Sequence, residues 1–366
     1  FFNKEVALLS KESLMKCGNF PDGKGLYWTD STDQELPIIL KPGDTVRVRT
    51  IPEVLSSNYR VMPNTLAMVG KKKQAGGKKP LYYNVNYTWK VYYKSIVKFA
   101  RSLIEVGVAH RKCVNIIGFN SPEWAIAFFG TIFCDCVVSG VYTTNQVDAC
   151  LYQARNSDAE LIVAEDEEQV LKYLKVYEEY PHIKAIVVYN DDAKRLREKY
   201  PDKAKLIYQW EEFLDLSEQP KTHQQLKTLL RERLRNLKAN RCCNIVYTSG
   251  TTGNPKGVML SHDNLLYNTT ISVENLVLAR NWKLDGTERI VSYLPLCHSA
   301  GQCVDLLVSM LSNAVLYFAK PDALQGSLLE TLLEVRPTLF FAVPRIWEKF
   351  EEKLKEVGLQ KGPALQ

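Results

Sequence analysis

Most of this chain alternates short apolar runs with amphipathic segments, and this alternation limits the folds open to it. The runs are rich in Val and Ile, while the segments between them carry apolar residues every three or four positions, the period of a helix. Strands joined through helices pair in parallel and are covered on both faces. We expect strands at residues 113–118, 137–141, 161–164, 183–189, 244–248, 258–260, 289–293, 314–318 and 338–342. The sequence therefore predicts an α/β fold with mostly parallel sheets covered by helices.

Capping signals mark where two early helices begin. Thr50 is followed by Pro52 and Glu53, which together supply an N-cap, an early proline and a capping-box acid. Thr88 precedes a segment with its apolar residues on one face, and Gly107 stands where that helix should end. We therefore expect one helix just after Thr50 and another between Thr88 and Gly107.

The N-terminal part has a weaker pattern. Residues 1–44 are irregular, and we expect them to form an extension before a domain that spans residues 45–366. Alternating residues at 45–49 predict a strand, and the lysine- and glycine-rich residues 71–80 predict a loop that joins two strands. The chain lacks an initiator Met, so we expect it to begin inside a longer protein.

Composition argues against several classes of function. The 47 basic and 41 acidic residues give a net charge of only +6, which does not imply nucleic acid binding. Nine cysteines without a C-x-x-C pair favour reduced thiols, and the five histidines lack ligand spacing, so we expect neither disulfides nor a metal site. The apolar residues 124–140 are interrupted by Asp135, so we expect no transmembrane segment. A cytoplasmic location follows as an expectation.

Residues 221–240 form an amphipathic stretch. Its apolar stripe consists of Leu226, Leu229, Leu230, Leu234 and Leu237, and its basic side of Arg231, Arg233, Arg235 and Lys238. We expect the stripe to pack on the domain and the basic side to face solvent. The alternative is that this helix, together with the lysine-rich loop, makes peripheral contact with an anionic membrane such as that of the endoplasmic reticulum.

One segment has the composition of a polyphosphate-binding loop. The sequence YTSGTTGNPKG lies between two expected strands, as in a polar hairpin. Its glycines let backbone N–H groups approach phosphate oxygens, its hydroxyls can donate to them, and Lys256 adds a positive charge. The candidate phosphate-binding residues are Thr248, Ser249, Gly250, Thr251, Thr252, Gly253, Asn254, Pro255 and Lys256. Among these, Lys256 and Thr251 are the candidate catalytic residues.

Two other interpretations of this segment are weaker. A Walker loop requires Gly-Lys followed by Ser or Thr at a helix start, whereas Lys256 lies between Pro255 and Gly257. A flexible linker would have a similar composition, but the flanking strands and the embedded Pro-Lys are unlike a linker.

The segment YTSGTTGNPKG resembles the phosphate loop of the adenylate-forming superfamily, which includes acyl-CoA synthetases, luciferases and peptide-synthetase adenylation domains. YLPLCH, ending at His298, is similar to a second family segment whose last residue lines the wall between the acyl and adenylate sites. VPRIW, GFNSPEW and VYTTN look most like the bubblegum-type branch of long-chain acyl-CoA synthetases. The resemblance runs from about residue 45 to the end of the chain.

This resemblance implies a large N-terminal adenylation domain that binds ATP, Mg²⁺ and a fatty acid. In the family the fatty-acid carboxylate attacks the α-phosphate, pyrophosphate leaves, and the acyl group then passes to coenzyme A. No enzyme nucleophile is needed, so catalysis depends on positioning and charge neutralisation. The same resemblance makes His298 a candidate substrate-binding residue.

The chain also departs from the family pattern. It stops before the family's YG-x-[TS]-E segment and before the small C-terminal domain needed for turnover, so we expect an adenylation domain that is incomplete at its C-terminus. Three alternatives stay open. The chain is the N-terminal piece of a working long-chain ligase, a non-catalytic module that binds nucleotide or acyl groups, or a ligase for a different class of acid.

Overall fold

Two β-sheets organise the chain. The computed structural model describes residues 32, 48–73, 82–220, 222–248 and 254–360. The larger sheet has seven strands in the order β7-β6-β5-β3-β4-β8-β9, all parallel except β9. Its strands are β3 (Cys113–Ile117), β4 (Val137–Val141), β5 (Ala159–Ala164), β6 (Ala185–Val188), β7 (Ile207–Gln209), β8 (Cys242–Thr248) and β9 (Lys256–Ser261). The predicted α/β class with mostly parallel strands is confirmed.

A smaller sheet lies beside the first. Its four strands have the order β10-β11-β1-β2, in which β11 is parallel to both neighbours and β2 is antiparallel to β1. The strands are β1 (Leu66–Lys73), β2 (Tyr82–Thr88), β10 (Arg289–Ser292) and β11 (Val315–Phe318). Segments from both halves of the chain therefore meet in one sheet.

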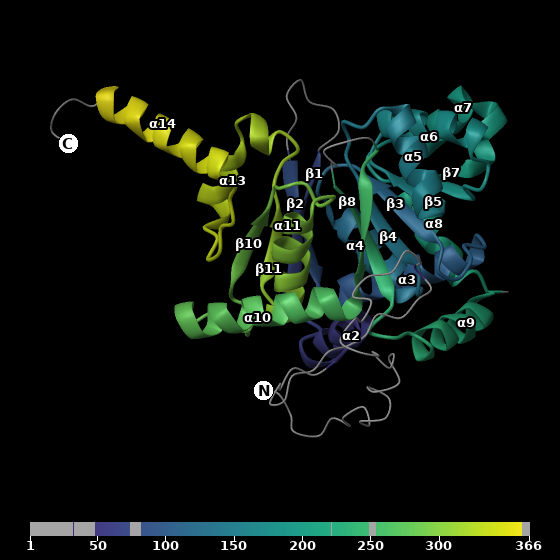
Figure 1. Cartoon of the computed structure of the whole chain (residues 1–366), viewed down its shortest axis with the longest axis horizontal. Coiled ribbons are helices and arrows are strands. Elements are labelled where there is room, and N and C mark those ends of the chain that lie inside the picture. Colours follow the sequence, from purple (N-terminus) through teal and green to yellow (C-terminus); the bar gives the residue numbers. More distant parts are fainter. Residues whose placement is uncertain (1–31, 33–47, 74–81, 221, 249–253, 361–366) are drawn as a thin grey trace, which may run out of the picture.

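Helix α4 (Pro122–Phe133) lies between the two sheets (Figure 1). It packs on β1 of the small sheet and on β3 and β4 of the large one, and each of its residues is buried. Such a helix, apolar on all sides, is typical of the interior of a large domain. At its start the packing is so close that a Cβ on Gly70 of β1 would lie 2.5 Å from Cγ of Pro122.

The remaining helices cover the outer faces or connect the strands. Alternate β3 residues point to opposite faces, so that Val114 and Ile116 join the core on the α4 side while Cys113 and Ile117 face α5 and α6. These helices are α2 (Ile51–Val61), α3 (Trp89–Glu105), α5 (Val147–Ser157), α6 (Glu167–Glu179), α7 (Ala193–Lys199), α8 (Trp210–Asp215), α9 (His223–Arg235), α10 (His262–Arg280), α11 (Ser299–Gly301), the π-helix η4 (Gln302–Val308), α12 (Ser309–Ser312), α13 (Leu328–Val335) and α14 (Pro344–Gln360).

The predicted helix starts are confirmed. The backbone N–H of Thr50 donates to Glu53 Oε2 at 2.6 Å, as a capping box requires. Thr88 Oγ1 accepts from the backbone N–H of Val91 at the start of α3, and Gly107 follows that helix with φ of +79°. Gly tolerates this left-handed conformation because it has no Cβ.

Other local predictions are wrong. Val48 and Arg49 are not in a strand, and residues 45–47 lie outside the described part. The basic segment does join two strands, but its first three lysines belong to β1, where Lys71 pairs with Glu334 and Lys72 with Glu123. The strand expected at 338–342 is reduced to one bridge between Leu339 and Ile290, and the short strand β7 was not predicted.

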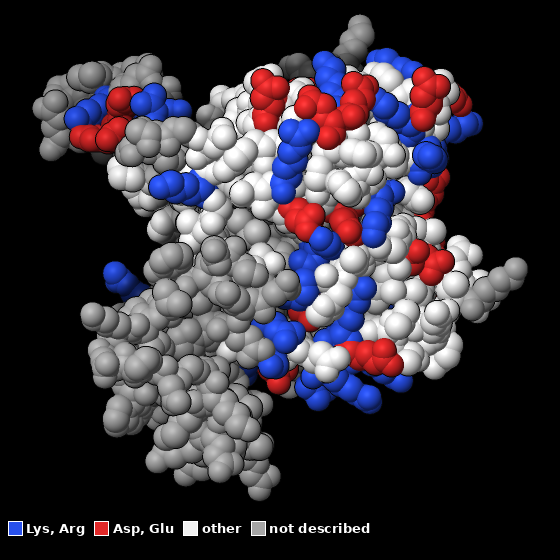
Figure 2. Space-filling model, turned by 45° about the vertical axis from the view of Figure 1, so that its right-hand side comes forward, with Lys and Arg blue, Asp and Glu red and all other residues white. Residues whose placement is uncertain are grey.

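Helix α9 packs by its leucine side. Leu226 and Leu230 are buried, and Arg233 turns inward to donate to the carbonyl oxygens of Cys134 and Val108. The packing interpretation of the leucine stripe is therefore confirmed, with Arg233 as an exception on the basic side. On the face shown in Figure 2, basic and acidic side chains are interspersed. No helix in the described part of the chain is long and apolar enough to cross a membrane.

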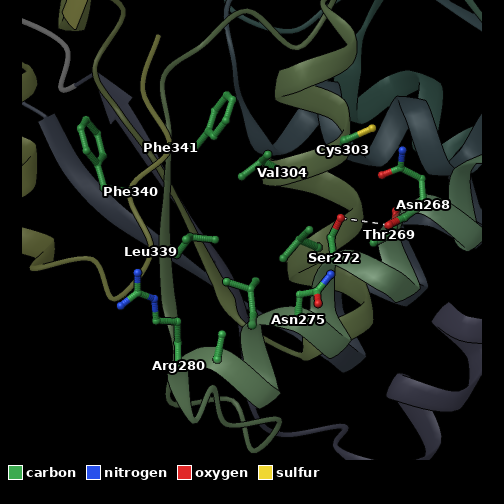
Figure 3. A pocket seen from close by; sticks show the side chains of 13 residues that line it. Asn268, Thr269, Ser272, Asn275, Arg280, Cys303, Val304, Leu339, Phe340 and Phe341 are labelled. Carbon is green, nitrogen blue, oxygen red and sulfur yellow. Dashed lines mark hydrogen bonds between the residues drawn. The ribbon is translucent and has the colours of Figure 1, made fainter. Parts of the chain in front are cut away.

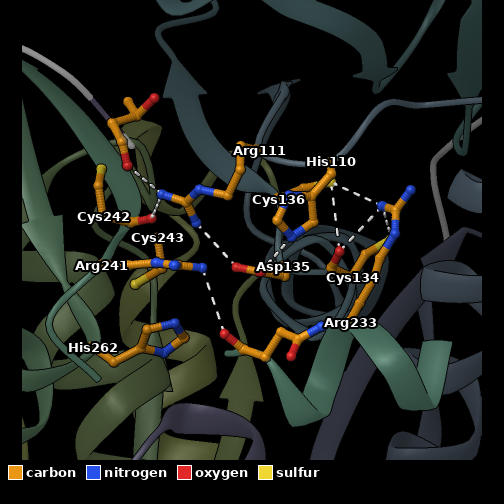
Figure 4. A network of polar contacts seen from close by, with 12 residues as sticks. His110, Arg111, Cys134, Asp135, Cys136, Arg233, Arg241, Cys242, Cys243 and His262 are labelled. Carbon is orange, nitrogen blue, oxygen red and sulfur yellow. Dashed lines mark hydrogen bonds and ion pairs between the residues drawn. The ribbon is translucent and has the colours of Figure 1, made fainter. Parts of the chain in front are cut away.

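A buried charge network ties the amino-terminal ends of the large sheet together (Figure 4). Asp135 precedes β4 and is only 1% exposed; it accepts from Arg111 at 3.0 Å and from His110 at 2.6 Å. Arg111 also donates to the carbonyl oxygen of Cys242 at 2.8 Å. The network therefore links the segment before β3 to the segment before β4 and to the first residue of β8.

We expect Asp135→Asn to destabilise the fold by about 3–5 kcal/mol, because it removes one partner of a buried ion pair, that between Asp135 and Arg111. Asn tolerates the left-handed backbone at this position, where φ is +52°. Asp158→Asn is the matched control, since Asp158 has φ of +56° but pairs with Lys112 at the surface. Its cost should stay below about 1 kcal/mol. Urea unfolding of both variants measures the difference, and equal losses would contradict this role for Asp135.

His262, the first residue of α10, predicts a pH dependence of stability. Burial, with a smaller contribution from Arg111, lowers its pKa to about 3, and its Nδ1 accepts from the backbone N–H of Ile51 at 3.3 Å. The unfolded chain takes up a proton at His262 below pH 6.5, while the folded chain does not until about pH 3. Stability is therefore complete above pH 6.5 and decreases as the pH falls through this window.

From pH 6.5 to pH 5 the loss attributable to His262 should be about 2 kcal/mol. His262→Asn retains an acceptor near the position of Nδ1 but does not titrate, so its urea-unfolding free energy should depend less steeply on pH. Parallel slopes for the two proteins would show that His262 is not the titrating group.

Candidate active site

The segment predicted to bind phosphate forms the β8–β9 hairpin. Thr248 ends β8 and pairs with Lys256, the first residue of β9, across an antiparallel ladder. Thr248, Asn254 and Lys256 are exposed and Pro255 is half-buried. The other predicted residues, Ser249, Gly250, Thr251, Thr252 and Gly253, lie outside the described residues.

Helix α5 anchors this hairpin from one side. Tyr152 donates its hydroxyl to the carbonyl oxygen of Pro255 at 3.0 Å, and Tyr247 donates to Asn156 Oδ1 at 2.7 Å. The two tyrosine rings meet edge to face with centroids 6.5 Å apart. Gly257 permits the close approach, because a Cβ there would lie 2.9 Å from Ile245 Cγ2. The backbone on both sides of Lys256 is therefore well supported.

Lys256 is exposed at the start of β9. Within the described part of the chain it forms no ion pair with an acidic side chain. It lies at the edge of the sheet that holds the carboxyl end of β8, and in open α/β sheets ligands collect at the carboxyl ends of strands. An exposed ammonium on a strand whose flanking backbone is held by α5 can neutralise phosphate charge with little reorganisation.

His298 lies in the turn after β10. It is exposed, it precedes α11, and its Nδ1 accepts from the backbone N–H of Ala300 at 3.1 Å. Residues 294–298, called here the 294–298 turn, run from the end of the small sheet toward the large one. The neighbouring Cys297 is buried against Gly140 of β4.

The hairpin and His298 belong to the same edge of the molecule. Strand β4 pairs directly with β8, with Ser139 opposite Ile245, so Gly140 lies close to the carboxyl end of β8. Because Cys297 touches Gly140, the next residue, His298, lies near the end of the strand that carries the hairpin. Two segments about forty residues apart in the chain are thus brought together, as expected for parts of one site.

A pocket of about 450 Å³ lies between helix α10 and η4. One wall is helix α10, and the other is formed by η4 and residues 339–341 (Figure 3). In Figure 3, Phe341 and Arg280 mark opposite ends of the pocket. Its lining is mainly apolar and consists of Asn268, Thr269, Ser272, Asn275, Leu276, Ala279, Arg280, Cys303, Val304, Val308, Leu339, Phe340 and Phe341.

Buried polar residues at this edge were not singled out from the sequence. Glu165, which follows β5, accepts from the backbone N–H of Phe119 at 2.7 Å, and burial raises its pKa. Tyr189 donates to the carbonyl oxygen of Phe119 at 3.0 Å. Asn120 and Gly140 also contact the 294–298 turn. Asn120 belongs to the family-like segment GFNSPEW, but neither residue was assigned a role from the sequence.

Metal-binding residues are absent from the described part of the chain. No three His, Cys, Asp or Glu side chains are grouped there so that they could hold an ion. The described cysteines are all free thiols, and nearly all of them are buried.

The two-sheet architecture is that of the N-terminal domains of adenylate-forming enzymes. A Segniliparus rugosus carboxylic acid reductase didomain in complex with AMP matches 86% of this chain and 46% of its own, with a TM-score of 0.64 at 17% identity. A Rhodopseudomonas palustris protein described as a long-chain-fatty-acid CoA ligase matches 81% of this chain and 64% of its own, with a TM-score of 0.59 at 17% identity. At this identity the likeness shows the fold alone.

Sequence comparison identifies the family. Residues 62–364 match the AMP-binding enzyme family, and the chain belongs to it. Long-chain-fatty-acid–CoA ligase ACSBG2 of Gallus gallus is 45% identical over 337 residues, which cover 90% of this chain and 41% of that protein. ACSBG1 of Mus musculus is 34% identical over 356 residues, or 97% of this chain and 46% of that protein. The resemblance to the bubblegum-type branch is confirmed, and the chain spans less than half of these relatives.

Proposed function

We propose that the protein is a long-chain fatty acid–CoA ligase. It would convert ATP and a fatty acid to an acyl-adenylate and pyrophosphate, and then transfer the acyl group to coenzyme A with release of AMP. The observation that carries this proposal is the meeting of the Lys256 hairpin and the 294–298 turn at one sheet edge. An apolar pocket is lined in part by η4, which begins four residues after His298. Relatives that carry the name of this activity match over 90% or more of the chain.

The proposed chemistry assigns each segment a task. The fatty-acid carboxylate is the nucleophile, so the protein needs to align it with the α-phosphate and to stabilise the departing pyrophosphate. We assign the second task to Lys256 and to the hydroxyls and N–H groups of residues 248–255, including Thr251. We assign the wall between the acyl chain and the adenylate to His298, and the acyl chain to the apolar pocket between α10 and η4.

Three further parts of the proposal rest on family membership. Mg²⁺ accompanies ATP in phosphoryl and adenylyl transfer, but we assign it no protein ligand because the described residues contain no suitable cluster. Coenzyme A is the second acceptor. Residues 45–366 would be an adenylation domain after an extension at residues 1–44, and turnover would also require a C-terminal domain.

We also propose a cytoplasmic location with peripheral contact at the endoplasmic reticulum membrane. The exposed Arg231 and Arg235 on the outer side of α9 support such a contact. Flotation of the protein with vesicles containing phosphatidylserine, but not with neutral vesicles, is the expected outcome. Lack of flotation with both would remove the membrane contact and leave the ligase proposal intact.

Lys256→Ala should lower fatty-acid-dependent ATP–pyrophosphate exchange by about 10²–10³-fold, the scale for loss of one pre-organised charge. The assay uses the product of the whole reading frame. Lys94→Ala, which removes an exposed lysine from α3, is the control and should leave the rate unchanged. An unaltered rate for Lys256→Ala would show that the hairpin is not the pyrophosphate site.

Acid profiling separates the remaining alternatives. The wild-type protein should form thioesters from long-chain acids more efficiently than from short-chain or aryl acids. The opposite preference would identify a ligase for another class of acid. ATP or acyl binding without any exchange, tested also on residues 1–366 alone, would instead support a non-catalytic binding module.

A further inference from the structure

The 294–298 turn is held by a buried amide from the opposite sheet. Asn120 lies in the loop between β3 and α4 and is 4% exposed. Its Nδ2 donates to the carbonyl oxygen of Leu294 at 2.7 Å, and its Oδ1 accepts from the backbone N–H of Leu296 at 3.1 Å. One side chain thus satisfies two backbone groups that flank Pro295, a residue without an N–H of its own.

The same amide also reaches the end of strand β10. Asn120 Nδ2 donates to Ser292 Oγ at 2.8 Å, and Ser292 is fully buried. The end of β10 and the 294–298 turn are therefore both held by one side chain from the loop that follows β3. A buried polar network that is this fully paired specifies one arrangement, because any shift leaves a backbone group unpaired in the interior.

A close steric contact with strand β4 also fixes the position of the turn. A Cβ built on Gly140 of β4 would lie 2.6 Å from Cα of Cys297 and 2.9 Å from its Cβ. The nearer atom belongs to the backbone, so it cannot move away by a change of rotamer. The absence of a side chain at Gly140 therefore determines how closely Cys297, and with it His298, approaches the end of β4.

The pocket wall is tied to the large sheet in a similar way. Asn244 of β8 donates through Nδ2 to Gln302 Oε1 of η4 at 2.7 Å, and both residues are buried. Helix η4 begins four residues after His298 and contributes Cys303 and Val304 to the pocket. The strand that leads into the Lys256 hairpin and the helix that lines the pocket are thus connected by one hydrogen bond.

We infer that Asn120 and Gly140 are positioning residues for acyl activation. They set how far His298 and the pocket wall lie from the phosphate-binding hairpin. This inference rests on the proposed ligase function and deepens it. Neither residue is proposed to contact the reacting atoms. Each acts through the 294–298 turn, whose displacement by about 1 Å can cost about 10²-fold in rate.

Two variants test the inference on the protein expressed from its whole reading frame. Asn120→Asp is nearly isosteric and keeps the acceptor for Leu296, but it removes the donor for the Leu294 carbonyl. Gly140→Ala changes no hydrogen-bonding group and adds one methyl against Cys297. Asn58→Asp is the matched control, because Asn58 is also a buried amide that donates to a carbonyl oxygen, that of Met310 at 2.7 Å, between α2 and α12.

We expect both test variants to lower kcat/KM for the fatty acid by about 10²-fold while the Kd for ATP, measured without acid, changes less than twofold. Hydrogen exchange in a peptide covering residues 294–298 should be faster in both variants. Asn58→Asp should alter neither kcat/KM for the acid nor this exchange at a temperature where it is folded. If Asn120→Asp does not fold, Gly140→Ala decides by the same readouts.

Three results would overturn the inference. In the first, the variants keep the wild-type kcat/KM for the acid. In the second, ATP binding and acid activation both fall in proportion to the folded fraction of the variant. In the third, Asn58→Asp shows the same loss of kcat/KM. Failure of the proposed function is distinguishable, because the wild-type protein itself would then show no acid-dependent exchange.

Discussion

The burial of helix α4 is the constraint on which the rest of the structure depends. A helix with one apolar stripe can cover one surface, but every residue of α4 is buried, so the helix needs apolar neighbours on all sides. Strand β1 provides them on one side and β3 and β4 on the other, while helices α3 and α2 cover the rest of its surface. Since a helix with its side chains is about 10 Å across, this single layer fixes the separation of the two sheets. Their carboxyl-end loops then meet at a defined edge.

This arrangement explains why polar residues concentrate at that edge. The loop from β3 into α4 enters the space between the sheets, where its backbone groups are shielded from water and need partners. The backbone N–H of Phe119 donates to Glu165, and its carbonyl oxygen accepts from Tyr189. The side chain of Asn120 donates to the backbone of the 294–298 turn, which approaches from the small sheet. The buried polar groups therefore compensate for loop backbone that the sheet packing removes from solvent.

The sequence predicted what local forces decide. Capping residues predict the helix starts at Thr50 and Thr88, and apolar runs predict the parallel strands β3, β4 and β5. Both signals act over only a few residues. Lys71 was misassigned to a loop because its partner, Glu334, is remote in the chain, and a lysine-rich strand is stable only with such partners. The strand expected at 338–342 failed because only Leu339 bridges to the edge strand β10 before α14 begins.

The candidate site could likewise be predicted only in part. His298 and Lys256 could be proposed from motifs, since glycines, hydroxyls and a lysine at close spacing suit phosphate whatever surrounds them. The contacts of Asn120 and Gly140 could not, because they arise only when two sheets are packed on one helix. A residue that acts through a distant turn leaves no periodicity and no spacing in the sequence.

The chemistry expected at this edge agrees with how the side chains there are arranged. Cys297 and His298 are adjacent, a pair that could suggest covalent catalysis, but burial raises the pKa of the Cys297 thiol to about 12 and His298 Nδ1 is occupied by the N–H of Ala300. A buried neutral thiol is a poor nucleophile. In the proposed reaction, whose substrate brings its own carboxylate, the protein would contribute mainly geometry. A small sheet packed on a large one through a shared helix brings the 294–298 turn and the Lys256 hairpin to one edge.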